Sequence, residues 1–200
     1  MAPSGDREGL IAVEGLRALP WDLLRPSALV DFIQLLACGK PAVRLLVGGD
    51  GEPRAVEALS LWCRDRGFGL AADGDGFACI AAEGGRAGRI LELDRRPGAH
   101  EVELGLALGY PRCCCERVAA VGESAIDAYA AEVAGWPFAG PYRRINPGGY
   151  RQGLSLICHL PCSPACVASL EIADRAREFL LAHATEPLFS GLIHSPVMSP

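Results

Sequence analysis

The sequence predicts an α+β fold, with a small N-terminal sheet layer and helices followed by a mainly helical, cysteine-rich C-terminal half. Half of the 200 residues are apolar, so the chain can bury a sizeable core. Short apolar runs bounded by proline and glycine, which are typical of strands, occur before residue 95, whereas helical periodicity dominates from His100 onward. Six of the nine cysteines lie within residues 113–166, inside that second half.

The length of 200 residues corresponds to one domain or to two small ones. The segment RRPGAH at residues 95–100 interrupts the pattern between the two halves. We therefore expect an α+β sheet subdomain over residues 1–97 and a helical Cys-cluster subdomain over residues 98–200. One continuous domain is the alternative.

The first predicted element of the sheet layer is a buried helix in residues 26–39, PSALVDFIQLLACG. Ser27 is its expected N-cap, and Gly39 is expected to end it. Asp31 and Gln34 are polar positions in an otherwise apolar run, so we expect them to mark a solvent-facing edge.

The run PAVRLLVGG at residues 41–49 predicts a strand, and the glycine-rich turn after it lacks the GK[ST] ending of a phosphate-binding loop. Residues 52–68 predict an amphipathic helix with Pro53 in its first turn. Its expected apolar stripe consists of Val56, Leu59 and Cys63. Hairpin-type turns, DGDG and EGGRA, separate three further expected strands at residues 68–72, 76–83 and 88–94.

The C-terminal half contains helical patterns at residues 99–109, 111–122, 123–135 and 163–184. The third pattern is either a separate helix or a continuation of the second. In the last helix, Ser163 is the expected N-cap and Pro164 the expected first helical residue. Residues 136–153 are rich in Pro, Gly and aromatic residues, which predicts a covering loop. The short run LSLIC that follows is expected to be extended or to begin a helix.

Composition argues against several classes of protein. A net charge of −5 disfavours a nucleic-acid binder. No stretch of about 20 apolar residues could span a membrane, and the N-terminus lacks the pattern of a secretory signal. Among 19 cationic residues only Lys40 is lysine, which, with the high Ala and Gly content, is typical of a GC-rich bacterial genome. We expect a cytoplasmic protein, in which clustered thiols bind metal or catalyse rather than form disulfides.

Both cysteine clusters lie at predicted helix starts. There the helix dipole and free N–H groups favour the thiolate, which is the form that binds metals. Adjacent helical residues point about 100° apart, so all three thiols of residues 113–115 cannot face one ion. Cys162 and Cys166, four residues apart, can share one face. The spacings match neither the zinc knuckle nor the ferredoxin run, but three or four thiolates suit zinc or an iron–sulfur cluster.

The stretches LGYPRCC and HLPCSPAC resemble the signatures, GYP-x-CC and H-x-PCS-x-x-C, of a little-characterised prokaryotic Cys-rich family. The resemblance covers roughly residues 100–180. The matching residues are Gly109, Tyr110, Pro111, Cys113, Cys114, His159, Pro161, Cys162, Ser163 and Cys166. The resemblance disfavours Cys115 and Cys158 as ligands and implies no particular reaction. The metal ligands predicted on this basis are Cys113, Cys114, Cys162 and Cys166.

Other polar residues lie close to the clusters in the sequence. His159 is a candidate catalytic acid or base, and its alternative is a hydrogen-bonded core histidine. Arg143, Arg144 and Asn146 lie on the loop before the second cluster, where a guanidinium can hold a carboxylate or phosphate; a solvated loop is the alternative. Tyr110 is a candidate pocket residue, and simple packing is its alternative.

Three functions are compatible with these residues. The first is an enzyme with a Cys-ligated iron–sulfur cluster or metal ion that acts on a small anionic substrate, with no nucleic-acid or membrane partner. The alternative is a structural zinc site in a regulatory or interaction protein. A third option is a metal-free thiol redox or sulfur-carrier protein that uses Cys113 and Cys114.

Overall fold

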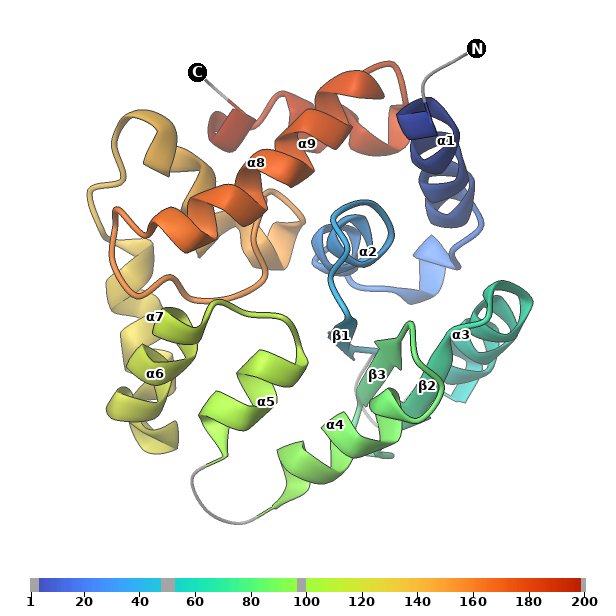
Figure 1. Ribbon diagram of the computed structural model, residues 1–200, viewed down its shortest axis with the longest axis horizontal. Helices are drawn as coiled ribbons and strands as arrows, with labels where there is room; N and C mark the ends of the chain where they lie inside the picture. Colours follow the sequence, from blue (N-terminus) through green and yellow to red (C-terminus); the bar gives the residue numbers. More distant parts are fainter. Residues whose placement is uncertain (1–3, 48–52, 97–99, 199–200) are drawn as a thin grey trace.

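The computed structural model describes residues 4–47, 53–96 and 100–198. It confirms an α+β, mostly helical fold with one small antiparallel sheet in the N-terminal half (Figure 1). The expected turn at residues 48–52 and part of the break at residues 95–100 lie outside the described residues.

The sheet consists of β1 (Ala42–Leu46), β2 (Gly69–Ala72) and β3 (Phe77–Ala81) in the order β1-β3-β2. Both pairings are antiparallel. The DGDG turn joins β2 to β3, as the sequence predicts. Oδ1 of Asp73 stabilises the turn by accepting hydrogen bonds from the backbone N–H groups of Asp75 and Phe77 at 2.8 and 2.9 Å.

The two faces of the sheet enter two hydrophobic clusters. Val43 and Ile80 point into the main core, whereas Cys79 and Ala81, from alternate positions, belong to a second cluster. The helices α2 (Ala28–Ala37) and α3 (Pro53–Arg66) contact the sheet on the side of the main core. The helix α4 (Arg86–Arg95) packs on β2 and β3 and contributes to the second cluster.

The strand expected at residues 88–94 is wrong, because this segment belongs to α4. Ala87, Ile90 and Leu91 are buried at the i, i+3, i+4 spacing of one helical face. This apolar stripe of α4 packs on the second face of the sheet and shields it from solvent. The predicted strand was only seven residues long, which is too short to distinguish the periodicity of a helix from that of a strand.

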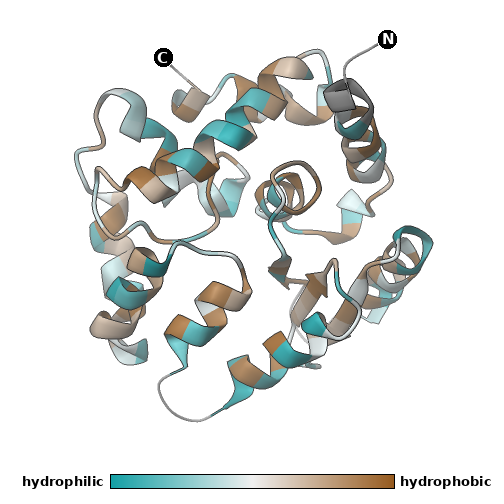
Figure 2. Cartoon of the chain, in the orientation of Figure 1, coloured by the Kyte–Doolittle hydropathy of each residue, from teal (hydrophilic) through white to brown (hydrophobic). Residues whose placement is uncertain are grey.

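The helix α2 confirms the helix expected at residues 26–39, but the expectation that Asp31 and Gln34 face solvent is wrong. Asp31 and Gln34 are 1% and 2% exposed, because α2 lies at the centre of the molecule with neighbours on all sides (Figures 1 and 2). Ser27 precedes the helix as predicted, but its side chain makes no capping hydrogen bond. An unpredicted helix, α1 (Ser4–Arg17), packs against α2 through Val13 and Leu16.

In the C-terminal half, α5 (Glu101–Ala107), α6 (Arg112–Val121) and α7 (Ile126–Ala134) confirm the first three expected helices. Gly122, at φ 79°, separates α6 from α7, so the third pattern is a helix of its own. The loop at residues 136–153 contains two 3₁₀ helices, η3 (Gly140–Ile145) and η4 (Pro147–Gln152). Residues 154–158 are irregular, neither strand nor helix.

The last long helix, α8, spans Val167–Ala182 and begins three residues after the predicted first residue. Its N-cap is Cys166, so Ser163 and Pro164 instead lie in the turn before it. Short helices follow in the C-terminal tail: η5 (Pro187–Phe189), α9 (Ser190–Ile193) and η6 (Pro196–Met198). A further 3₁₀ turn precedes α2 at Trp21–Leu23, and another precedes α7 at Glu123–Ala125. The main core extends from Val13 to Met198, so both halves contribute to it.

Candidate metal centre

Two segments about 50 residues apart in the sequence bring four thiols together. Cys113 and Cys114 lie in the first turn of α6, and Cys162 and Cys166 lie in the turn that leads into α8. The four Sγ atoms all lie within 4.8 Å of one another. The four cysteines that the sequence analysis selected therefore form one group that can hold a metal ion.

Three of the sulfur–sulfur separations are short and nearly equal. Sγ of Cys166 lies 3.7 Å from that of Cys114 and 3.9 Å from that of Cys113, and the two neighbouring thiols are 3.9 Å apart. Cys114 and Cys166 are buried, Cys162 is half-buried, and Cys113 is exposed. The group thus lies at the edge of the core, with one corner open to solvent.

The local backbone explains why these thiols converge. Pro111, with φ −59° and ψ 135°, is the N-cap of α6, two residues before Cys113, and Cys166 is itself the N-cap of α8. Two helix N-termini therefore meet at the site, and both favour negative charge. The turn that carries Cys162 is anchored from outside, because the hydroxyl of Tyr129 on α7 donates to the carbonyl of Pro161 at 3.1 Å.

Ser169 is a site residue that the sequence analysis missed. Its hydroxyl is fully buried, donates to Sγ of Cys166 at 3.3 Å and lies 3.4 Å from Sγ of Cys114. Nε2 of His159 lies 2.9 Å from the same oxygen. Position 169 follows Cys166 by three residues, so the i, i+3 spacing of α8 was the available signal.

The hydroxyl of Ser169 has a single proton, which determines the direction of these bonds. With that proton donated to Cys166, the N–H of His159 Nε2 donates to Ser169, and Nδ1 carries the lone pair. Nδ1 is buried and has no hydrogen-bond partner within the described residues. A hydrogen-bond relay therefore connects His159 through Ser169 to the thiol of Cys166. Hydrogen bonds of this kind orient the ligands in metal sites.

The thiols differ in acidity. Burial alone would raise the pKa of Cys166, but hydrogen bonds from Ser169 and from the thiols of Cys162 and Cys114 outweigh it and lower that pKa to about 7. Burial raises the pKa of Cys114 and, to about 11, that of Cys162. Negative charge therefore gathers first on Cys166, and a bound cation would favour the loss of the remaining thiol protons.

His159 is neutral at physiological pH. Burial, together with the positive charge of Lys40, lowers its pKa to about 3. Its ring stacks at a tilt on Tyr110, with centroids 5.3 Å apart. The expectation that His159 moves a proton in catalysis stays a prediction, and its hydrogen bond to Ser169 is what connects it to the thiol group.

Cys115 and Cys158 lie outside the group of four thiols. Cys115 points to the opposite side of α6, where its Sγ donates to the carbonyl of Tyr110 at 3.8 Å. There α5 and α6 pack so closely that a Cβ at Gly105 would lie 2.5 Å from that sulfur. Cys158 contacts Lys40 and Gln34 instead.

The candidate substrate-binding residues on the loop at residues 136–153 differ in their surroundings. Arg143 is exposed on η3, whereas Arg144 makes a 2.6 Å ion pair with Asp174 of α8. The side chain of Asn146 caps η4 by accepting the N–H of Gly148 at 2.8 Å. Their expected roles in substrate binding stay predictions.

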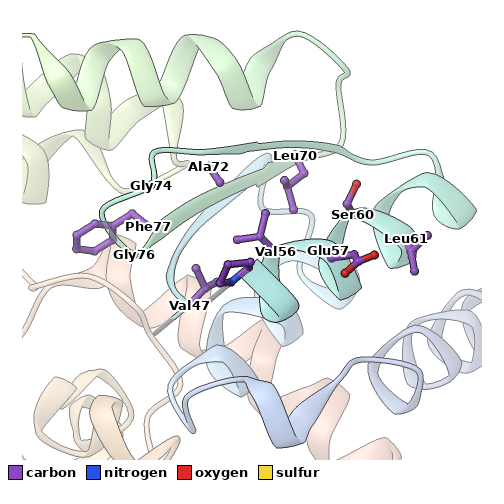
Figure 3. Close-up of a pocket in the computed structure, with 11 residues that line it drawn as sticks. Val47, Val56, Glu57, Ser60, Leu61, Leu70, Ala72, Gly74, Gly76 and Phe77 are labelled. Carbon is purple, nitrogen blue, oxygen red and sulfur yellow. The ribbon is translucent and has the colours of Figure 1, made fainter. Parts of the chain in front are cut away.

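A cleft of about 480 Å³ lies between α3 and the β2–β3 hairpin (Figure 3). Val56, Leu70 and Phe77 form part of its mainly apolar lining, and Glu57 and Ser60 border it. None of the four site cysteines lines this cleft. It therefore offers no substrate cavity beside the thiol group.

Comparisons with family models, with curated proteins and with solved structures find no match to this chain. The resemblance to the Cys-rich prokaryotic family thus stays a prediction, carried by the residues of its two signatures. Within the described ranges, every helix is too short or too polar to cross a membrane.

Proposed function

We propose that the chain binds one zinc ion through Cys113, Cys114, Cys162 and Cys166. The observation that carries this proposal is the spacing of the sulfurs, which is 3.7–3.9 Å for three pairs and at most 4.8 Å for all. Thiolates at about 2.3 Å from a tetrahedral zinc ion lie about 3.8 Å from one another by simple geometry. The spacing of the four sulfurs is therefore close to that of four thiolates around a single tetrahedral ion.

The same spacing favours a single ion over the iron–sulfur cluster. In a cubane cluster each thiolate binds a different iron at an outer corner, which holds the sulfurs further apart than one shared ion does. Here Cys113 and Cys114 are neighbours in the sequence, with sulfurs 3.9 Å apart. Such a pair suits two ligands of the same ion.

The proposed role of the ion is structural, in a regulatory or interaction protein. Four thiolates close the coordination shell of zinc, and Ser169 donates to Cys166 the hydrogen bond that orients this ligand. The ion would fasten the first turn of α6 to the turn before α8. Cys114 and Cys166 belong to the main core, whereas Cys113 is exposed and Cys162 only half-buried, so the ion would tie this edge to the core. Metal binding would therefore supply folding free energy here.

X-ray absorption at the zinc edge tests this proposal on protein purified without added metal. We expect a single shell of four sulfur neighbours at about 2.3 Å and no neighbouring metal. A metal–metal distance in the spectrum, or a shell dominated by nitrogen and oxygen, would overturn it.

The enzyme hypothesis is the second candidate, and the exposure of Cys113 is the observation that favours it. Displacement of that one ligand would leave three thiolates and an open position on the metal. A cobalt-substituted protein tests this, with inorganic phosphate as the probe. A shift of its visible bands on adding phosphate would favour the enzyme, whereas unchanged bands would favour the closed structural site.

A further inference from the structure

Lys40 is the single lysine of a chain whose other 18 cationic side chains are arginines. It lies between α2 and β1, and its side chain is only 4% exposed. The one lysine side chain is thus held in the interior of the protein. A buried lysine offers a chemistry that arginine lacks, because its amine can lose a proton and act as a nucleophile.

The contacts of Lys40 form a compact polar cluster apart from the four-thiol group. Nζ lies 2.8 Å from Sγ of Cys158 and 3.8 Å from Oδ1 of Asp31. The thiol of Cys158 donates to Oε1 of Gln34 at 3.0 Å, and the hydroxyl of Tyr150 donates to Oδ2 of Asp31 at 2.6 Å. An amine, a thiol and a carboxylate thus meet in one place.

We propose that Lys40 and Cys158 form an oxidation site, in which a peroxide joins Nζ to Sγ through a covalent sulfur–nitrogen bond. Nζ of Lys40 donates a hydrogen bond to Sγ of Cys158 at 2.8 Å, closer than the sum of their van der Waals radii, so bonding requires only a small closing movement. Cys158 is half-buried. A sulfenic acid condenses with a nearby nitrogen in the same way elsewhere in protein chemistry.

The reaction balances with one equivalent of hydrogen peroxide. Peroxide oxidises the Cys158 thiol to a sulfenic acid and is reduced to water. Lys40 gives its extra proton to Asp31, and the neutral amine attacks the sulfur. The sulfur–oxygen bond breaks as the sulfur–nitrogen bond forms, and the departing hydroxide takes one amine proton and leaves as water.

The neighbouring groups affect the protonation of Asp31 and of Cys158. Burial raises the pKa of Asp31, although Lys40 and Tyr150 oppose this effect, and its Oδ1 lies 3.8 Å from Nζ as the carboxylate acceptor of the ammonium proton. Burial also raises the pKa of Cys158 to about 12, although Lys40 opposes this effect. Little thiolate is therefore present at neutral pH, and the peroxide step is the slow one.

The cross-link would join the two halves of the chain. Lys40 lies just before β1, whereas Cys158 lies four residues before the metal-site cysteine Cys162. The site does not depend on metal at the four thiols, so its test is separate from that of the proposed function.

The sole lysine makes the test specific, because disulfide formation consumes thiols but leaves amines untouched. The intact protein is treated with hydrogen peroxide, quenched, denatured and labelled with an amine-reactive ester, and the label on Lys40 is measured by peptide mass spectrometry. We expect oxidised protein to lose most of the Lys40 label and a thiol reductant to restore it. The linked peptide pair would be lighter by two hydrogens than its parts.

Cys158→Ser is the matched variant, since it keeps a polar atom beside Lys40 but has no sulfur. Its Lys40 label should be unchanged by peroxide. The proposal is wrong if Lys40 of the wild-type protein stays fully labelled after Cys158 has been oxidised. It is equally wrong if Cys158 remains a free thiol while the exposed Cys113 is consumed. Both readings use the wild-type protein, so they hold even if the variant fails to fold.

Discussion

The hydroxyl of Ser169 donates to Sγ of Cys166 at 3.3 Å, one helical turn along α8, and so connects the buried His159 to the thiol group. Replacing this serine with alanine removes the donor that stabilises the thiolate. We expect Ser169→Ala to weaken zinc binding by about 10–100-fold, as measured by competition with a chelator. The pKa of Cys166 in the metal-free protein should rise above its value of about 7.

Ser155→Ala is the control for this substitution, because Ser155 is also fully buried and hydrogen-bonded but contacts none of the four thiols. Equal zinc affinities for Ser169→Ala and the wild-type protein would show that the relay does not act on the metal ligands.

Each of the four ligand cysteines should be needed for stable metal binding. We expect single serine substitutions of Cys113, Cys114, Cys162 and Cys166 to give substoichiometric zinc and a lower melting temperature, because metal binding contributes folding free energy. Cys115→Ala is the neighbouring control, since this thiol points away from the group. Retention of full zinc by any ligand variant would remove that residue from the site.

The ion pair of Lys40 and Asp31 should be strongly coupled, since both side chains are at least 96% buried. Lys40→Met leaves the carboxylate without its cation, and we expect a loss of about 3–5 kcal/mol in unfolding free energy. The double variant Lys40→Met/Asp31→Leu should be clearly more stable than this single variant. Denaturant titration measures both, and additive losses would contradict the coupling.

His159 should make stability depend on pH. Its pKa in the folded state is about 3, below the value of about 6.5 expected in the unfolded chain. The unfolded state therefore binds the proton more tightly, so this contribution to stability is complete above pH 6.5 and declines as pH falls toward 3. The difference in unfolding free energy between wild type and His159→Gln, measured in the same zinc-containing buffers, should shrink over that window. Parallel curves for the two proteins would contradict this.

The sequence was sufficient for the features that depend on local pattern. The DGDG hairpin, the helices around the cysteines and the four thiols that converge all follow from turn chemistry, periodicity and the two signatures. The prediction of a strand at residues 88–94 was wrong because Ile90 and Leu91 lie on one face of a helix. That face packs on the second side of the sheet, a contact that cannot be seen in the local sequence. Local pattern could not show this long-range requirement.

The buried polar residues show a second limit of sequence analysis. Asp31 and Gln34 fit a solvent-facing edge of an amphipathic helix by every local rule. Their partners, Tyr150 and Cys158, come from segments more than 100 residues away. The relay through Ser169 was hidden for a different reason, because its only signal was the i, i+3 spacing from Cys166, and that spacing is meaningful only once the start of α8 is known.

Metal analysis of the native wild-type protein, purified without oxygen or added metal, is the decisive test of the single-ion zinc site. We expect a colourless protein with one zinc ion per chain, no acid-labile sulfide, and loss of the ion in the Cys166→Ser variant. A brown protein with several irons and sulfide per chain would contradict the single-ion site. So would a fully folded wild-type protein that holds no metal at all.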